Sequence, residues 1–546
     1  MFRLWGLRIL AAVFIGLGLV QSSWSQDNPS LPARKPVSTS RAVRARGVVY
    51  NDLNRNRLRD AGEPGLPGVR VSNGTDIVKT DAQGRYELTA TDDTILFVIK
   101  PRNYMTHVNA QNLPQFYYVH KPAGSPKNFK YPGVAPTGPL PESIDFALYQ
   151  KPEPDKFRAL FFGDTQPRDV AEVEYMTHDI IEQVVANEAH QASFGVTLGD
   201  IVFDDLSVME PHNQAIALIG LPWYNVLGNH DQNYEAADDS QSDETFERVY
   251  GPSYYSFDHG PTHFIVVDDV TWIAAKDGQK AKYVGGLGPE QMSFIRNDLA
   301  SIPEDQLVVL MMHIPLIEVL DRQDLYRLIE KRPAAISLSA HTHNMQHYFI
   351  GQEDGWMGPK KHHHIINVTV CGSWWSGRKD ERGIPHATMS DGGPNGYSIM
   401  EFDGASYSLQ FRAAGRPADY QMNIYAPESI KSSAAAETQI IANVFNGNER
   451  CKCEMRLADA DSKTTDWIEM KATTMADPAL EAEIAKDLLD AGRKWRDLPK
   501  PHLTPHIWTA KLPASPKTGT QMIEVRVTFP DGKTHTGRRG ISVQAD

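Results

Sequence analysis

The sequence contains very little cysteine, with only Cys371, Cys451 and Cys453 among 546 residues. Cys451 and Cys453 are so close together that a bridge between them would be strained, so we expect a fold that does not depend on disulfides. Net positive charge is also missing. The formal net charge of −13 argues against a nucleic-acid backbone or an anionic membrane as the main partner. It does not argue against a small anionic ligand, because a local metal charge can outweigh the overall field.

The sequence has an apolar run near its N-terminus, but this run is shorter than the length needed to span a membrane. The run Ile9 to Val20 follows Arg3 and Arg8 and precedes Ser23-Trp24-Ser25. This pattern predicts a secretory signal peptide over residues 1–25, cleaved after Ser25. No cysteine lies near that point, which excludes lipid anchoring there. We therefore expect an exported protein, periplasmic or extracellular, with no transmembrane anchor after cleavage. The sequence does not indicate its oligomeric state.

The chain is too long for a single core, and its composition changes along its length. The predicted fold class is α/β (α+β): a core of two sheets flanked by helices, with a small all-β domain on each side. The expected parts are a linker over 26–43, a β-sandwich over 44–149, the α/β core over 155–416 and a β-rich domain over 420–546 with one helix capped by Asp477. Core strands are expected at 157–162, 194–198, 221–227, 263–267, 307–312, 335–338, 364–370, 397–402 and 408–411, and a helix at 169–187.

Five polar blocks in the expected core each follow an apolar strand. Strand ends of α/β proteins are where sites are built, because a rigid sheet positions the residues that follow it. Two aspartates, one asparagine and three histidines form a mixed oxygen and nitrogen set that suits two neighbouring ions bridged by one carboxylate. The blocks are Gly163-Asp164-Thr165-Gln166, Gly199-Asp200 with Asp204 beyond it, Gly228-Asn229-His230-Asp231, Met312-His313-Ile314-Pro315 and Ala340-His341-Thr342-His343.

The order and spacing of these blocks resemble those of the calcineurin-like metallophosphoesterase superfamily, over roughly residues 155–415. The resemblance implies a hydrolase that binds two divalent transition-metal ions, Mn, Fe or Zn. A hydroxide bridging the ions would attack a small phosphate-ester substrate, and His230 would donate a proton to the leaving group while Asp231 orients its ring. The ligands implied are Asp164 and His343 for the first ion, Asp200 as the bridge, and Asn229, His313 and His341 for the second.

Gln166 departs from the pattern of that superfamily, which usually has histidine at this position. An amide oxygen is a harder and weaker ligand than imidazole, so coordination by Gln166 would favour Mn or Fe over Zn at the first site. The alternative is that Gln166 only forms a hydrogen bond with a bound water. Asp204 is expected to be structural or to support a ligand.

A loop in the expected N-terminal sandwich has the spacing of a calcium site. Its oxygen-bearing residues occupy positions 1, 3, 5, 9 and 12, and the loop resembles those of SdrD-type B-repeat domains, where such loops bind calcium. It departs from an EF-hand loop by having Arg57 where a sharp turn favours glycine. The alternative is a polar hairpin loop without metal. The residues are Asp52, Asn54, Asn56, Asp60 and Glu63.

Two further stretches could shape the substrate site. Trp374 and Trp375 offer flat faces, Arg378 a fork for a second anionic group, and Asn395 a further polar contact, so we hypothesise that they bind substrate. The alternative is that the tryptophans belong to the core. The acidic segment 232–247 follows His230 and is either a lid or a solvated excursion.

Three functions are compatible with the sequence. The first is an exported metal-dependent phosphoesterase. The second is a phosphodiesterase specific for nucleotides or for glycerol or sugar phosphodiesters. The third is a cell-surface binding protein with an inactive central domain, against which stands the presence of all six expected ligands.

Overall fold

The structure is a computed structural model that describes residues 42–546 except 277, 460 and 462. The expected signal peptide and most of the expected linker, up to residue 41, lie outside the described residues. No helix in the described part is long and apolar enough to cross a membrane. The cysteines Cys371, Cys451 and Cys453 are all free, as expected.

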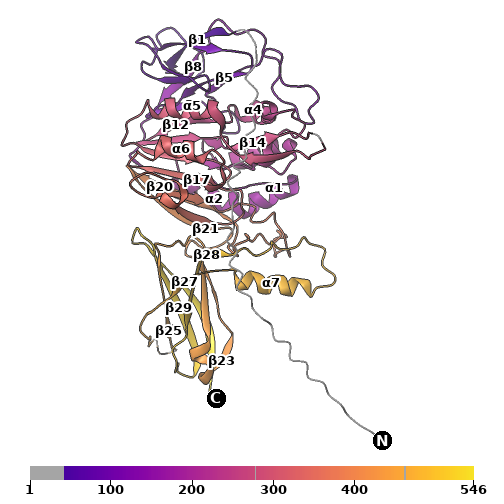
Figure 1. The fold of residues 1–546 in the computed structure, drawn as a ribbon, viewed down its shortest axis with the longest axis vertical. Coiled ribbons are helices and arrows are strands. Elements are labelled where there is room, and N and C mark those ends of the chain that lie inside the picture. The colour runs from indigo at the N-terminus through magenta and orange to yellow at the C-terminus, as the bar shows by residue number, and fades with distance from the viewer. Residues whose placement is uncertain (1–41, 277, 460, 462) are drawn as a thin grey trace. The chain divides into compact units, whose positions relative to one another are not determined.

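Two sheets form the central region, which we define as residues 156–413, and this confirms the predicted fold class (Figure 1). The five-stranded sheet runs in the order β11 (Trp223–Asn225), β10 (Phe194–Thr197), β9 (Lys156–Phe162), β20 (Gly396–Asp403) and β21 (Ser406–Ala413). The six-stranded sheet runs in the order β12 (Tyr255–His259), β13 (Thr262–Val266), β16 (Leu307–Met311), β17 (Ala335–Ser339), β19 (His362–Ile366) and β18 (Gln346–Ile350). A separate hairpin pairs β14 (Val270–Ile273) with β15 (Lys282–Gly285).

The predicted helix over 169–187 is present but interrupted. Asp169 caps it by accepting a hydrogen bond from the backbone N–H of Glu172, and a π-helical turn over Thr177–Ile181 separates α1 from α2. The helices of the central region are α1 (Val170–Met176), α2 (Glu182–Ala186), α3 (Met209–Ala217), α4 (Glu244–Tyr250), α5 (Gly288–Leu299) and α6 (Arg322–Ile329). The strand expected over 221–227 is reduced to β11, which begins directly after Pro222, a residue without a backbone donor.

Parallel strands bring the predicted site blocks to common sheet edges. β9 pairs in parallel with β10, and β10 with β11, while β16 pairs in parallel with β13 and β17. Side chains that follow parallel neighbours therefore emerge at the same edge. β20 returns from more than 200 residues away to pair antiparallel with β9.

The N-terminal region, residues 43–150, is built from two four-stranded sheets, as expected for a small β-sandwich. One has the order β4 (Arg85–Ala90), β1 (Val43–Asn51), β8 (Phe146–Gln150) and β6 (Tyr104–Thr106). The other has the order β3 (Ile77–Lys79), β2 (Arg70–Ser72), β5 (Thr94–Ile99) and β7 (Tyr117–His120).

The C-terminal region, residues 422–544, contains two more sheets and the helix α7 (Pro478–Leu488). Asp477 caps α7 by accepting hydrogen bonds from the N–H groups of Ala479 and Leu480, as predicted. The helix ends at Leu488. One sheet has the order β22 (Met422–Tyr425), β24 (Gln439–Val444), β28 (Thr504–Lys511) and β27 (Lys471–Met475); the other has β23 (Ser429–Lys431), β30 (Thr534–Gln544), β29 (Gly519–Thr528), β25 (Lys452–Ala458) and β26 (Ile468–Glu469).

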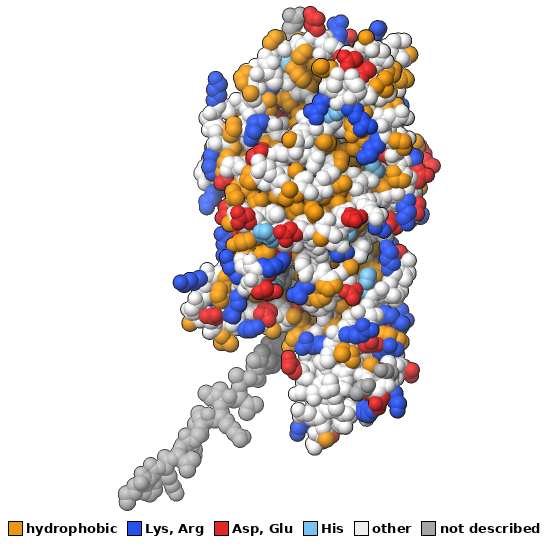
Figure 2. All heavy atoms as spheres, turned by 180° about the vertical axis from the view of Figure 1, so that it is seen from behind, with side chains coloured by type: hydrophobic (Ala, Val, Ile, Leu, Met, Phe, Trp, Pro, Cys, Tyr) orange, Lys and Arg blue, Asp and Glu red, His pale blue; other side chains and the backbone are white. Residues whose placement is uncertain are grey.

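The apolar clusters of the core do not coincide with the three regions. One apolar cluster runs through both the N-terminal and central regions, for example where Phe97 meets the ring of Phe294 at 5.7 Å. The C-terminal region has its own cluster and meets the central region through a small one, where Phe411 lies 5.3 Å from Phe445. On the face shown in Figure 2, acidic and basic side chains are interspersed, so neither sign dominates that surface.

Candidate metal centre

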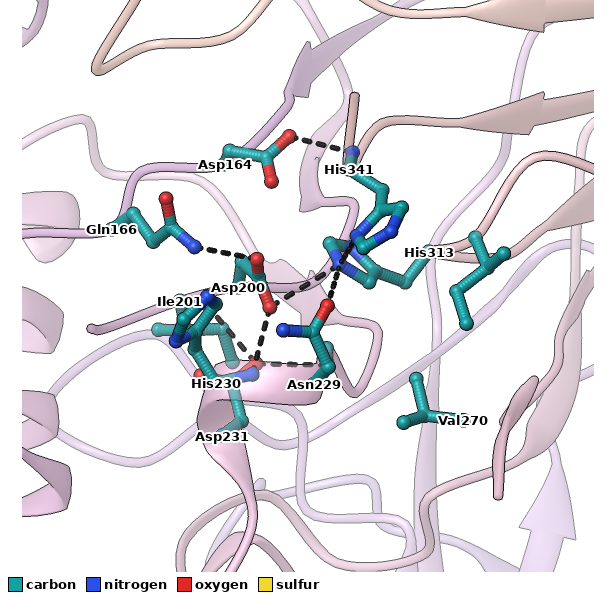
Figure 3. A network of polar contacts seen from close by, with 12 residues as sticks. Asp164, Gln166, Asp200, Ile201, Asn229, His230, Asp231, Val270, His313 and His341 are labelled. Atoms are coloured by element: carbon teal, nitrogen blue, oxygen red, sulfur yellow. Dashed lines mark hydrogen bonds and ion pairs between the residues drawn. The ribbon is translucent and has the colours of Figure 1, made fainter. Parts of the chain in front are cut away.

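The structure brings together side chains from all five predicted blocks (Figure 3). Asp164 follows β9, Asp200 follows β10, Asn229 follows β11, and the remaining ligands follow β16 and β17. Asp200, His313 and His341 each offer an atom within 4.8 Å of the others. Segments separated by more than 170 residues therefore converge on one point.

The centre of the cluster is the Nε2 atom of His313. It lies 3.2 Å from Asp200 Oδ1, 3.1 Å from Asn229 Oδ1 and 3.1 Å from His341 Nδ1. The other ring nitrogen, Nδ1, lies 2.9 Å from the carbonyl oxygen of Leu198, which assigns it the proton and directs Nε2 toward the cluster. Three further possible ligand atoms thus lie within 3.2 Å of His313 Nε2.

Asp164 and His343 lie on another side of the cluster. His343 Nδ1 faces the carbonyl oxygen of Gly372 at 2.5 Å, so Nε2 turns toward Asp164 Oδ1, 3.8 Å away. Asp164 Oδ2 accepts a hydrogen bond from the backbone N–H of His341, but the buried Oδ1 has no partner among the described residues.

Burial and charge shift the titration of these groups in opposite directions. Burial disfavours ionisation of Asp200, but the charges of His313 and His230 outweigh it and lower the pKa of Asp200 below its usual range. Burial lowers the pKa of His313, but the charge and hydrogen bond of Asp200, the charge of Asp164 and the hydrogen bond to Leu198 together raise it to about 10. Burial lowers the pKa of His341 to about 3 and that of His343 to about 4, so both are neutral, as metal ligands must be.

These observations fit divalent cations. The unpartnered Oδ1 of Asp164 and the close approach of two imidazole nitrogens are unfavourable unless a cation or a proton lies between them. Carboxylate, amide and imidazole ligands are the mixture that divalent transition metals accept.

The backbone is strained at five positions of the predicted site blocks. Asp164, Gln166, Asp200, His341 and His343 all have positive φ, between 33° and 73°, although none is glycine. Left-handed backbone costs a non-glycine residue about 1–3 kcal/mol and is concentrated at functional sites. Gly228 is required for a different reason, since a Cβ there would lie 1.9 Å from the backbone nitrogen of Asp200.

The structure corrects the predicted partner of His230. Asp204, not Asp231, contacts the ring: His230 Nδ1 lies 2.6 Å from Asp204 Oδ1. The buried Asp231 instead accepts hydrogen bonds from the N–H groups of Ile201, Val202 and Gly228. Asp231 therefore stabilises the loops that carry Asp200 and His230, because its carboxylate is hydrogen-bonded to three buried backbone N–H groups.

Sequence reasoning did not identify several residues around His230 and His313. Phe203 stacks on the His230 ring at 4.5 Å, and Tyr234 donates a hydrogen bond to Asp204. Asp269 accepts hydrogen bonds from the N–H groups of His313 and Ile314. Asp269 comes soon after the predicted strand 263–267, so the strand-end rule applied to the other blocks could have found it.

Gln166 is oriented so that its amide nitrogen, not its oxygen, faces Asp200. Nε2 donates to Asp200 Oδ2 at 2.5 Å, and the oxygen accepts a hydrogen bond from Trp374 Nε1. Coordination through the oxygen requires the amide to turn over and to lose the Trp374 contact. The assignment of Gln166 as a ligand stays a prediction.

The predicted substrate-binding residues do not act together. Trp374 packs on His343 with ring centroids 4.3 Å apart, so it lies at the site. Trp375 is a core residue and Asn395 is buried, donating to Asp179 and to the carbonyl oxygen of Val370, so these two predictions are wrong. Arg378 pairs with Asp490 at 3.2 Å and lies over the ring of Trp495, and its assignment to the substrate stays a prediction.

The acidic segment 232–247 is held against the N-terminal region. Lys121 contacts both Glu244 and Glu247, and Asn233 donates to the carbonyl oxygen of Tyr131. These contacts exclude the solvated excursion. The segment instead places Tyr234 against Asp204.

The residues of the expected calcium loop do converge. Asp60 Oδ2 accepts hydrogen bonds from the side-chain amides of Asn54 and Asn56, while Glu63 accepts from the N–H groups of Leu53 and Asp60. Arg57 adopts φ +68°, the conformation for which glycine was expected. Asp52 accepts from the N–H groups of Asn56 and Arg57, and its Oδ2 also lies 2.8 Å from His107 Nε2. Calcium binding stays a prediction.

Three family models match consecutive parts of the chain. They are described as the N terminal of calcineurin-like phosphoesterase (residues 53–133), calcineurin-like phosphoesterase (157–345) and the C terminal of calcineurin-like phosphoesterase (363–535). The chain is a calcineurin-like phosphoesterase. As a member of that family this phosphoesterase is metal-dependent and uses divalent ions, and the middle model spans the predicted ligands from Asp164 to His343.

Solved structures similar to this phosphoesterase are distant. Purple acid phosphatase PPD1 from yellow lupin (Lupinus luteus) seeds is 14% identical over 64% of this chain and 67% of that one, with a TM-score of 0.36. A dimetal phosphatase from Danio rerio is 12% identical over 47% of this chain and 96% of that one, with a TM-score of 0.32. No curated protein matches this phosphoesterase in sequence.

Proposed function

We propose that this phosphoesterase is exported and hydrolyses phosphate esters at a dinuclear centre. The observation that carries the proposal is the convergence of Asp200 Oδ1, Asn229 Oδ1 and His341 Nδ1 on His313 Nε2, all within 3.2 Å. Export is supported by the apolar run near the N-terminus of the sequence. The proposed ligands are Asp164 and His343 for the first cation, Asp200 for both, and Asn229, His313 and His341 for the second.

When bound, divalent cations lower the pKa of water and neutralise charge that develops on the phosphoryl oxygens. The residues of this chain prepare the centre for them. Gln166 and the backbone N–H of His230 donate to the two oxygens of Asp200 and fix its carboxylate plane. Trp374 in turn holds the Gln166 amide. The bridging carboxylate is thereby oriented before any ligand arrives.

His230 is the proposed proton donor to the leaving oxygen. Its Nδ1 is bound to Asp204 and its ring lies flat against Phe203, which leaves Nε2 as the nitrogen available to a substrate. Burial lowers the pKa of His230, but the charges of Asp200 and Asp204 raise it above its ordinary value. These two carboxylates favour the protonated ring, which is the form that a general acid requires.

Metal analysis and turnover test this function together. Purified full-length protein should contain about two transition-metal ions per chain by stoichiometry, and stripped protein should regain activity with Mn, Fe or Zn. His230→Ala should lower kcat by about 10²–10⁴-fold with metal content unchanged. Assays on alkyl phosphomonoesters and diesters separate the two substrate types. Protein without stoichiometric metal and without turnover would indicate an inactive central region instead.

A further inference from the structure

Three aromatic side chains lie beside the metal centre, and we call Tyr234, Trp272 and Tyr283 the aromatic row. Trp272 on β14 and Tyr283 on β15 are directly opposite each other in the hairpin. The ring of Tyr234 stacks on Trp272 with centroids 5.2 Å apart and an angle of 16° between the planes. Cross-strand pairing and stacking therefore join residues from two separate segments.

Both ends of the aromatic row touch the site. Tyr234 donates its hydroxyl to Asp204 Oδ1, the oxygen that also lies 2.6 Å from His230 Nδ1. Tyr283 presents its ring at 83° to that of His341, with centroids 5.9 Å apart. The row thus extends from the support of the proposed proton donor to a proposed metal ligand.

The two tyrosines expose much of their surface. Trp272 in the middle is only 6% exposed, whereas Tyr234 is 40% and Tyr283 is 37% exposed. An exposed aromatic ring fixed beside a reaction centre offers a flat apolar surface on which another ring can stack. Such stacking is worth about 1–3 kcal/mol for a nucleobase.

The aromatic row is held in place before substrate arrives. The backbone N–H and the indole N–H of Trp272 donate to Asp239 and to the carbonyl oxygen of Ala236. Both acceptors belong to the segment after His230, whose continuation is fixed to Lys121 by Glu244. A rigid surface of this kind favours selectivity because little conformational freedom is lost on binding.

The other side of the centre offers less for recognition. Trp374 is engaged with Gln166 and His343, and Arg378 is committed to Asp490. Arg378, the fork expected to bind a second anionic group, thus already has a carboxylate partner. Recognition through a ring is better supported than recognition through a second charge.

We propose that the aromatic row selects the organic part of the substrate, so that the preferred phosphate esters carry a flat aromatic ring close to the phosphoryl group. This rests on the proposed function, because it places the phosphoryl group on the centre formed by Asp200, His313 and His341. Nucleoside 5′-phosphates and simple benzyl-type esters share the required chemistry. The Tyr283 ring, rather than its hydroxyl, supplies the contact.

Matched ester pairs test the proposal on the metal-loaded full-length protein. AMP and ribose 5-phosphate differ only by the base, and benzyl phosphate and cyclohexylmethyl phosphate differ only in ring planarity. We expect kcat/KM to favour the flat-ring member by about 10-fold or more, in line with the stacking energy. A preference in the AMP pair alone identifies nucleotides as the source of the ring, and a preference in both pairs identifies any flat ring.

Variants then assign the preference to the row. Tyr283→Ala should reduce the ratio of kcat/KM values at least fivefold through loss of the flat-ring ester, and Tyr283→Phe should keep it. Tyr425→Ala removes an equally exposed tyrosine from the C-terminal region and should change nothing. Equal kcat/KM within both pairs, or equal losses for both members in Tyr283→Ala, overturns the proposal.

Binding separates this proposal from the proposed hydrolysis. Dissociation constants of AMP and ribose 5-phosphate for metal-loaded His230→Ala protein can be measured by calorimetry without turnover. If wild-type protein hydrolyses no ester, the proposed function fails, and the binding ratio still decides the specificity. Tighter binding of AMP supports the aromatic row, and equal binding rejects it.

Discussion

The two flanking β regions are joined to the central region by different chemistry. On the N-terminal side, buried charges meet: Arg70 lies 2.6 Å from Asp258 and 2.9 Å from Asp298, and Lys100 lies 2.6 Å from Glu153. On the C-terminal side, the contacts are mostly amide and backbone hydrogen bonds, such as Asn443 to the carbonyl oxygen of Asp391 and Gly377 to that of Arg496. One buried imidazole, His506, also reaches Asp391 at 3.2 Å.

The difference teaches what each region does for the metal centre. Removing one partner of a buried ion pair leaves the other charge buried and is strongly destabilising. The N-terminal region therefore belongs to the same cooperative folding unit as the central sheets. The C-terminal region, through Asn443 and His506, instead contacts Asp391, which lies behind a proposed ligand. Asp391 accepts a hydrogen bond from the N–H of Met345, two residues after His343, and Ser390 donates its N–H to the carbonyl oxygen of His343.

The largest expected effect comes from breaking the N-terminal junction. Arg70→Met removes the guanidinium from the buried Asp258 and Asp298, which keep His263 at 2.7 and 2.8 Å. We expect a loss of about 3–5 kcal/mol in the free energy of unfolding, measured in urea. The exposed pair of Arg44 and Glu87, 3.7 Å apart, provides the control: Arg44→Met should cost less than about 1 kcal/mol. Equal effects of the two variants would contradict the comparison.

Acid should weaken the same junction next. Burial opposes ionisation of Glu153 and Asp258, but hydrogen bonds and nearby positive charge lower the pKa of each to about 2. Because these values lie below those of the unfolded chain, the stabilisation is present above about pH 4 and disappears as the pH falls toward 2. Each group is worth on the order of 2–3 kcal/mol.

Thermal unfolding between pH 5 and pH 2.5 measures this loss. The midpoint should fall steeply, and less steeply in Asp258→Asn. Glu437→Gln, at an exposed pair with Lys511 in the C-terminal region, should follow the wild-type curve. A midpoint that does not change with pH over this range would rule out these two carboxylates as stabilising groups.

The smallest of the three effects is expected at the C-terminal junction. Asp391→Ala removes the acceptor of the Met345 N–H and frees the loop behind His343. Residues that position metal ligands typically change metal affinity by about 10–100-fold, and we expect a loss in that range. Metal titration of stripped protein measures it. Asp490→Ala, which removes the exposed partner of Arg378, should leave the affinity unchanged.

Much of the fold and the identity of the clustered side chains could be predicted from the sequence because both depend on local patterns. Each predicted strand is a short apolar run, and the Gly-Asp, Gly-Asn-His or His-x-His block that follows it marks where the strand ends. The pairing of β20 with β9 could not be predicted, since no local pattern encodes a partner more than 200 residues away. The order of strands in each sheet depends on such pairings.

The errors at the site arise from burial rather than from chemistry. Asp231 is adjacent to His230 in sequence and Asp204 lies in another predicted block, and the choice between them depends on which backbone amides are left to be satisfied. Trp374 and Trp375 are adjacent and identical, but one lies at the cluster and the other in the core. Packing in three dimensions decides both cases.

The left-handed backbone at the ligand positions limits how this centre can be redesigned. Asparagine, aspartate and histidine are enriched among the non-glycine residues that accept positive φ, whereas β-branched side chains are strongly disfavoured there. The ligands at Asp164, Asp200, His341 and His343 belong to that tolerant group. Exchanging aspartate for asparagine or histidine would alter the metal preference while keeping the loops intact, but valine or isoleucine at the same positions would reshape the polypeptide before any ion could bind.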